Sequence, residues 1–131
     1  MNVKDFAEKY IIAEYDAFQK GDFSKLAKIE DANVVYHITP VPDTVGHEAH
    51  KQFIIDMRQL ITDLKFEFKY ITGEGSLFAL AFKSNYKVIG EKPGYVLPVG
   101  KIITEDFLFV CRLEKGKVRE VWANGSFTFT D

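Results

Sequence analysis

Residues 101–124 read KIITEDFLFVCRLEKGKVREVWAN, and the rest of the architecture can be built outward from them. Apolar and β-branched residues make up most of 101–113 and 118–124, which is typical of two strands. The intervening residues 114–117 are polar and contain Gly116, a residue that readily adopts the positive φ of a tight hairpin turn. The stretch therefore predicts two antiparallel strands joined directly.

More strands precede this hairpin. Residues 64–71 alternate apolar and charged side chains, which predicts a strand with one face toward water. Residues 77–89 predict a long strand that is apolar on both faces at its start. Three glycines and two prolines make 90–100 a loop or an irregular edge. Two readings remain open for Phe127 and Phe129, which either extend the last strand or pack back on the body.

Helical patterns occupy the N-terminal half. Residues 3–19 predict an amphipathic helix, and 23–29 predict a second, short one. A short strand is expected at 34–39, followed by a helix over 47–62. The last helix has a 3.6-residue apolar stripe made of Ala49, Phe53, Met57, Leu60 and Ile61. Clustered helices followed by hairpin-linked strands indicate an α+β fold with a strongly curved sheet.

Composition narrows the function. A length of 131 residues fits a single domain over 1–131. The 17 basic and 19 acidic residues give a net charge of −2, which argues against nucleic acid and against a polybasic membrane anchor. With no membrane-length apolar run and no signal-peptide pattern, we expect a cytoplasmic protein. The single cysteine, Cys111, excludes an internal disulfide, and the 12 Phe and 6 Tyr can line a ligand cavity.

Short motifs along nearly the whole chain resemble the nuclear transport factor 2-like superfamily, and within it the SnoaL-like polyketide cyclase and ketosteroid isomerase group. They are Gly21-Asp22, Val34-Val35-Tyr36-His37, Gly46, Thr62-Asp63-Leu64, Gly73-Glu74-Gly75, Pro98-Val99-Gly100-Lys101 and residues 116–122 with Trp122. The resemblance implies a cone-shaped α+β barrel. In it, N-terminal helices pack against a strongly curved mixed, mainly antiparallel sheet. Because this superfamily contains enzymes, binding proteins and scaffolds, the resemblance does not imply one activity.

Glu14 is the first candidate for catalysis, because it lies near the centre of the apolar face of the first helix. A carboxylate there needs a partner, or its pKa rises until it is neutral. A raised pKa suits a general acid or base near pH 7. The other reading is a glutamate that pairs with a Lys or Arg or reaches the rim. The isomerases of the resembled group carry a tyrosine here, so this chain departs from their pattern.

His37 is the second candidate. The resemblance implies a cavity-facing acid or base near the end of the first strand, where Tyr36 and His37 are the candidates. Neighbours on a strand point to opposite faces, so only one of them faces the cavity. His37 is favoured because its pKa lies near neutrality and because many SnoaL-like chains carry a histidine here. Its alternative role is a structural hydrogen bond to a backbone carbonyl.

Two acids that the resembled enzymes use are missing. Phe109 stands where the isomerases place a protonated acid, and the nearby Asp106 is expected on the opposite face. The resembled cyclases place an aspartate shortly after the tryptophan of the last strand, whereas here Trp122 is followed by Ala123, Asn124, Gly125 and Ser126. The absence of these two acids counts against both the isomerase reaction and the cyclase reaction of the resembled enzymes.

The expected cavity surrounds the catalytic candidates His37 and Glu14. Its predicted ligand-binding residues are Tyr10, Phe18, Tyr36, Phe53, Met57, Tyr86, Trp122 and Asn124. His47 and His50 are spaced i, i+3, but no third ligand is evident in the sequence, so no metal is expected. No cofactor is expected either, because enolisation and ring closure require only acid–base chemistry.

The sequence leaves three functions open. The first is a cofactor-independent enzyme of cyclase, isomerase or dehydratase type acting on a small apolar or aromatic molecule. The second is a non-catalytic binder of such a molecule, and the third is a dimeric scaffold. A homodimer is expected in any case, because residues 77–82 and 107–113 are apolar on both faces of the sheet.

Overall fold

The structure is a computed structural model that describes residues 2–39 and 41–131. Its elements are α1 (Val3–Tyr15), a π-helical turn η1 (Asp16–Lys20), α2 (Ser24–Ile29), β1 (Glu30–Ile38), β2 (Thr44–Val45), α3 (His47–Leu60), β3 (Ile61–Glu74), β4 (Leu77–Val88), β5 (Ile102–Glu114) and β6 (Lys117–Thr130). The predicted order of helices followed by long strands is therefore confirmed.

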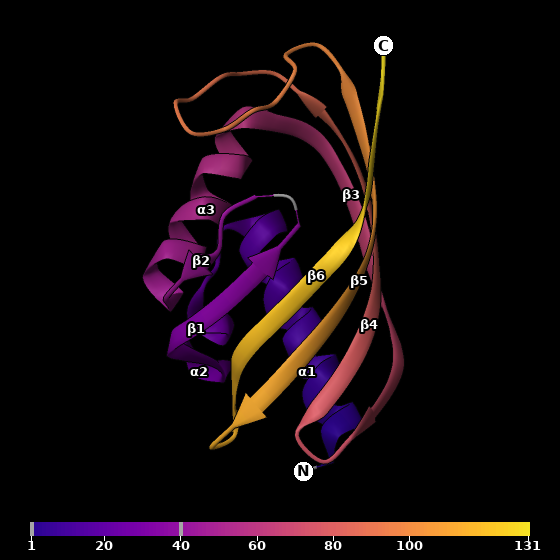
Figure 1. Cartoon of the computed structure of the whole chain (residues 1–131). Coiled ribbons are helices and arrows are strands. Elements are labelled where there is room, and N and C mark those ends of the chain that lie inside the picture. The colour runs from indigo at the N-terminus through magenta and orange to yellow at the C-terminus, as the bar shows by residue number, and fades with distance from the viewer. Residues whose placement is uncertain (1, 40) are drawn as a thin grey trace.

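The strands form one sheet in the order β2-β1-β6-β5-β4-β3. β1 runs parallel to β6, and every other neighbouring pair is antiparallel. The long strands curve, and the helices lie on one side of them (Figure 1). We call the sheet face toward the helices the inner face and the opposite one the outer face. This mixed, open sheet confirms the expected cone-shaped α+β fold.

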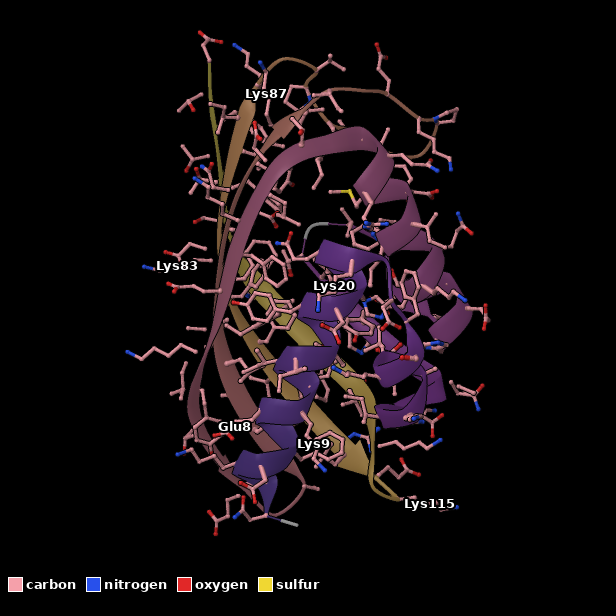
Figure 2. The ribbon with its side chains drawn as sticks, turned by 180° about the vertical axis from the view of Figure 1, so that it is seen from behind. Glu8, Lys9, Lys20, Lys83, Lys87 and Lys115 are labelled. Carbon is pink, nitrogen blue, oxygen red and sulfur yellow. The ribbon has the colours of Figure 1, made fainter. Side chains whose placement is uncertain are left out.

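The first helix forms where its pattern predicts. The side chain of Asn2 caps it by accepting a hydrogen bond from the backbone N–H of Asp5 at 2.8 Å. The helix continues through η1 and ends at Gly21, whose φ of 68° is the left-handed conformation that glycine adopts most easily. Figure 2 shows Glu8 and Lys9 on its solvent side, so the opposite, apolar side packs on the sheet.

Three segments differ from the sequence-based expectation. β1 begins at Glu30, four residues before the predicted strand. The sequence does not predict this start, because Glu30 and Asp31 are charged. β2 forms between the predicted strand at 34–39 and the predicted helix at 47–62, and it pairs with β1. β6 continues through Phe127 and Phe129, which decides between the two readings of these residues in favour of a longer strand.

The core has two parts. The larger part lies between α1 and the inner face and includes the fully buried Tyr10, Phe78 and Leu80. The smaller part, around Met57 and Tyr86, lies under the end of α3. Burying side chains of this size contributes roughly 1.5–3 kcal/mol each, so these contacts fix the helices on the sheet.

Four inner-face phenylalanines are less well covered. Phe66, Phe68, Phe82 and Phe109 share this face, but each keeps partial solvent exposure. Ring centroids are 4.7 Å apart for Phe68 and Phe82, and 5.4 Å apart for Phe82 and Phe109. We call these four residues the aromatic patch. The helices therefore leave part of the concave sheet face uncovered.

Within the described part of the chain, no helix is long and apolar enough to cross a bilayer.

Candidate functional site

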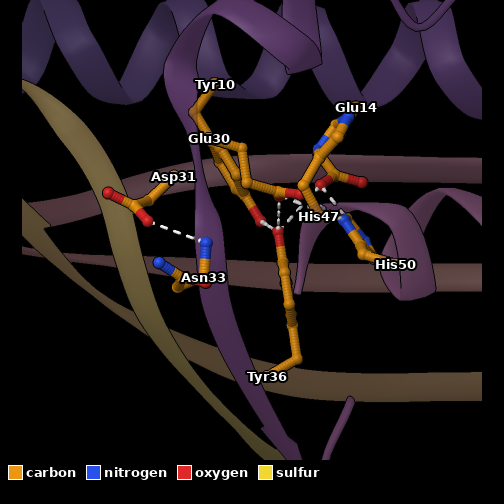
Figure 3. Close-up of polar contacts among 8 residues, drawn as sticks. All are labelled: Tyr10, Glu14, Glu30, Asp31, Asn33, Tyr36, His47 and His50. Atoms are coloured by element: carbon orange, nitrogen blue, oxygen red, sulfur yellow. Dashed lines mark hydrogen bonds and ion pairs between the residues drawn. The ribbon is translucent and has the colours of Figure 1, made fainter. Parts of the chain in front are cut away.

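Polar side chains meet inside the protein where α1, β1 and α3 converge (Figure 3). Each of these elements supplies two of them. The group, which we call the buried cluster, consists of Tyr10 and Glu14, Glu30 and Tyr36, and His47 and His50. Five of the six are buried, and the His47 side chain is 12% exposed. Charged groups inside a protein require partners, so their mutual contacts decide what the cluster can do.

Glu30 is the acceptor at the centre of the cluster. Tyr36 donates to its Oε2 at 2.6 Å, and Nδ1 of His47 donates to its Oε1 at 2.8 Å. Nδ1 of His50 lies 3.0 Å from both oxygens. Burial alone raises the pKa of Glu30, but the charge of His50 and these donors outweigh it and hold the pKa below its usual value. Glu30 is therefore an anion at neutral pH.

His50 stands between Glu30 and Glu14. Its Nε2 lies 3.8 Å from Oε1 of Glu14. Burial alone lowers the pKa of His50, but the negative charge of Glu30, its hydrogen bond and the charge of Glu14 raise it, and the net direction is upward. Burial raises the pKa of Glu14 to about 6, although the charge of His50 opposes the shift. Glu14 therefore gains and loses a proton near physiological pH, beside an imidazole that can carry one.

Two tyrosine hydroxyl groups connect the carboxylates. The hydroxyls of Tyr10 and Tyr36 are 2.8 Å apart, and that of Tyr36 lies 3.5 Å from Oε1 of Glu14. Burial raises the pKa of both tyrosines well above the usual value. They therefore remain protonated and can donate hydrogen bonds.

The structure places seven of the ten predicted site residues on the inner side. Tyr36 rather than His37 points inward from β1, which decides between the two alternatives. The seven are Tyr10, Glu14 and Tyr36 in the buried cluster, Met57 and Tyr86 in the smaller core, and Phe18 and Phe53 packed against both cores.

The placement of His37 has to be corrected. Its Nδ1 lies 2.9 Å from Asp43 and its Nε2 lies 2.6 Å from Glu120, on the side of β1 away from the buried cluster. Carboxylates only accept hydrogen bonds, so both ring nitrogens donate. The bond to Glu120 is the main cause of a raised pKa for His37. The structure does not bring His37 and Glu14 together, and the His37 side chain is 32% exposed.

Trp122 and Asn124 need the same correction. On β6, Val121 and Ala123 are buried against the core, so Trp122 and Asn124 point to the outer face. β1 is in parallel register with β6, with His37 opposite Trp122, and their rings stack with centroids 5.7 Å apart. These three residues therefore do not line the interior.

Sequence reasoning missed Glu30, His50 and Glu105. In the sequence, His50 stands out only through its i, i+3 spacing from His47, with no third metal ligand evident. The structure brings one ligand atom each of Glu14, Glu30 and His50 within 4.8 Å of one another, so these three could hold a cation. The hydrogen bonds of His50 to Glu30 and its 3.8 Å ion-pair contact with Glu14 account for the same arrangement without a cation. Glu105 faces inward from β5, away from the cluster, beside Ser84.

Two depressions open elsewhere on the described surface. One of about 380 Å³ lies beside the turns at Gly75 and Gly116 and includes Phe6, Ile29 and Leu113 in its lining. The other, of about 250 Å³, lies beside His37 and Asp43. Neither is lined by a residue of the buried cluster.

Comparisons with known proteins identify relatives of this fold. No curated protein matches the chain. AclR of Streptomyces galilaeus has 21% identity and a TM-score of 0.71, with 95% of this chain and 91% of that chain covered. An NTF2-like protein of Burkholderia xenovorans has 13% identity and a TM-score of 0.74, with 96% and 92% covered. A computationally designed 17-OHP binder has 14% identity and a TM-score of 0.71, with 95% and 98% covered.

The similarity to these structures shows only the fold, whereas the match to a family model shows the family of the chain. The model of the SnoaL-like polyketide cyclase family matches residues 10–125, which is most of the chain. This chain therefore belongs to the SnoaL-like polyketide cyclase family.

Proposed function

We propose that the protein binds a small, largely apolar molecule against its inner face. We further propose that the buried cluster carries out cofactor-independent acid–base catalysis of the cyclase or isomerase type. The observation that carries the proposal is Glu14, a buried carboxyl with a pKa of about 6 beside His50. A group whose pKa lies near the working pH is efficient in proton transfer.

The chemistry assigns a role to each group. Enolisation requires a base that takes a proton from carbon and a donor that stabilises the oxyanion formed. Glu14 is the base in this proposal. The Nε2–H of His50 is the donor, because Nδ1 of His50 contacts Glu30 whereas Nε2 lies 3.8 Å from the Glu14 carboxyl.

The aromatic patch supports the ligand part of the proposal. Its rings remain partly exposed although they face the helices, and such a surface suits an apolar ligand. A protein with a similar fold is a computationally designed 17-OHP binder, which supports a ligand-binding role for this architecture.

Proton abstraction can be tested with 5-nitrobenzisoxazole, whose ring opens to a coloured phenolate when a base removes its C–H proton. We expect the protein to accelerate this reaction, with kcat/KM rising through about pH 6 as Glu14 loses its proton and then levelling off. Because an amide is not a base, Glu14→Gln is expected to lower kcat/KM about 100-fold. Absorbance of the product measures the rate.

The control is His37→Gln, which changes a histidine that also contacts two carboxylates, but on the outer side. Its rate should equal that of the wild type. A Glu14→Gln variant as active as the wild type would exclude Glu14 as the base, and a wild-type rate equal to that of buffer would exclude catalysis of this proton transfer.

Non-catalytic binding is the second candidate function. The observation that favours it is that every buried side-chain nitrogen and oxygen of the described residues already has a hydrogen-bond partner. A fully satisfied cluster can serve stability alone. In that case 5-nitrobenzisoxazole would bind, as seen by shifts of amide NMR signals, but would not turn over.

We also propose a homodimer through the outer face. Leu108 is 48% exposed and Trp122 is 40% exposed there, with the partly exposed Val110 paired to Trp122. Sedimentation at micromolar concentration should give twice the 15.0 kDa of the chain. Trp122→Glu should give a monomer, because a charge in an apolar interface is costly to desolvate. A monomeric wild type would contradict the proposal.

A further inference from the structure

The C-terminal part of β6 has an edge that is not paired with another strand. β1 stops pairing with β6 at Ala123, and within the described chain no further strand lies beside residues 124–130 on that side. Figure 1 shows this part of β6 continuing past the end of β1. All residues of 124–130 are exposed, including Phe127 at 38% and Phe129 at 56%. An open strand edge is a template on which another strand can form hydrogen bonds.

The hydrogen bonds at the end of β1 show which backbone groups of β6 face this edge. The backbone N–H of Thr39 donates to the carbonyl oxygen of Ala123 at 3.1 Å, so the backbone groups of Ala123 point toward β1. This direction alternates along a strand, and the pairing of β6 with β5 is regular from Ala123 onward. The N–H and C=O groups of Gly125, Phe127 and Phe129 therefore point to the open edge.

The long strand at the opposite edge of the sheet is protected against such pairing. β3 has charged side chains at alternate positions over 65–69, and its register with β4 shifts at two places. The hydroxyl of Tyr15 also donates to the backbone carbonyl of Phe66 at 2.9 Å. Charges, irregular pairing and covering side chains are devices that prevent edge pairing. Residues 121–130 read VWANGSFTFT, with no charge, no proline and no shift of register against β5, so this edge remains available.

The open edge of β6 is complementary to itself. If two copies of β6 lie antiparallel about a two-fold axis at Thr128, Phe127 of one copy stands opposite Phe129 of the other. Both residues direct their backbone groups to the edge, so each such pair can exchange backbone hydrogen bonds. No like charges meet in this arrangement, because residues 126–130 are uncharged. In this register, residues 126–130 of the two copies lie side by side, clear of Ala123 and β1.

We propose that residues 126–130 of β6 pair antiparallel with the same residues of a second copy of this chain, which joins the two sheets into one. This contact is separate from the outer-face homodimer, which uses Trp122. Phe127 lies on the inner side with Phe107, since their ring centroids are 5.0 Å apart, so the second copy would add apolar side chains there. The contact is smaller than a standard interface, so we expect it to form above micromolar concentration.

Disulfide formation between two copies tests the pairing. Thr128→Cys and its matched control Ser126→Cys each place an exposed thiol on the outer side of β6, and both are made in the Trp122→Glu chain to remove the outer-face contact. Across the proposed axis, the Cα atoms would be about 4.5 Å apart at position 128, within reach of a disulfide, and about 13 Å apart at position 126. Cys111 is buried in both variants. Under mild oxidation, Thr128→Cys should form the covalent dimer about tenfold faster or more. Equal rates would overturn the proposal.

Amide hydrogen exchange tests the same pairing without an added thiol. In the Trp122→Glu chain, the amides of Phe127 and Phe129 should exchange about fivefold or more slowly at millimolar than at micromolar concentration, because the second copy covers them. The amide of Thr128 faces β5, so its exchange should not depend on concentration. Exchange that is independent of concentration at Phe127 and Phe129 would exclude the edge pairing and leave the outer-face homodimer unaffected.

Discussion

His50→Leu is expected to lower the free energy of unfolding by about 3–5 kcal/mol. The substitution removes the imidazole that lies 3.0 Å from Glu30 and 3.8 Å from Glu14, and it leaves two carboxyls buried without this partner. Removing one partner of a buried ion pair is costly because the remaining charge cannot regain its water. For a chain of this length, we expect the Tm at pH 7 to fall by about 10–20 °C, measured by circular dichroism.

The pH dependence of the variant provides a second readout. The folded-state pKa of Glu14 is raised above the ordinary value, so the folded state binds its proton at a higher pH than the unfolded state does. Stability from this group is therefore present at low pH and lost as pH rises through the folded-state pKa. Loss of His50 removes an influence that lowers this pKa. The Tm of His50→Leu should accordingly rise as pH falls from 7.5 to 5.

His37→Leu is the control, because His37 also contacts two carboxylates but is partly exposed. Partly exposed ion pairs contribute about 0–1 kcal/mol, so its Tm should change by only a few degrees. If the Tm fell equally in the two variants, burial of the His50 contacts would not add to their contribution to stability.

The order and type of most elements could be predicted from local patterns. The 3.6-residue period of the first helix and the hairpin at Gly116 both depend on neighbours in the sequence. The start of β1 could not be predicted in this way. Glu30 is charged and would not be expected in a buried strand. It can be buried because Tyr36, farther along β1, and His47 and His50 on α3 form hydrogen bonds with its carboxylate.

Glu14 could be found because a polar side chain interrupts an apolar helix face. The same rule would have found Glu105, which shares a strand face with Ile103, Phe107 and Phe109. His50 was missed for a related reason. In the first half of α3 the buried positions are His50 and Ile54, one residue after the predicted Ala49 and Phe53. Met57 and Leu60 farther along the helix are buried as predicted. One residue rotates a helix by about 100°, which is enough to turn the histidine inward.

The inward or outward direction of β1 and β6 could not be obtained from either strand alone. Each strand carries a predicted site residue on its outer face: His37, predicted to be catalytic, on β1 and Trp122, predicted to bind ligand, on β6. Their parallel register then places both on the outer face together. Packing against α1 and α3 fixes which face of β1 and β6 points inward. This one constraint therefore determines the orientation of several predicted site residues at once.

Gly125→Ala is expected to lower the free energy of unfolding by about 3 kcal/mol. A Cβ at this position would overlap the backbone carbonyl oxygen of Asp106 and would lie 2.6 Å from Cα of Phe107. Backbone atoms of a paired strand cannot rotate away as a side chain can, so β5 and β6 must separate locally. Urea unfolding should show the loss as a lower midpoint.

The effect should extend to the inner face of the sheet. Phe107 pairs with Gly125 and lies two residues from Glu105, and its ring contacts Phe127 with centroids 5.0 Å apart. Moving Phe107 therefore shifts the inner face beside its register partner Phe82, a member of the aromatic patch. Gly90→Ala is the control, because its added Cβ would meet the Leu60 side chain at 3.5 Å, an ordinary contact. If both alanine variants unfold at the wild-type urea concentration, the close approach of β5 and β6 at Gly125 is not required for stability.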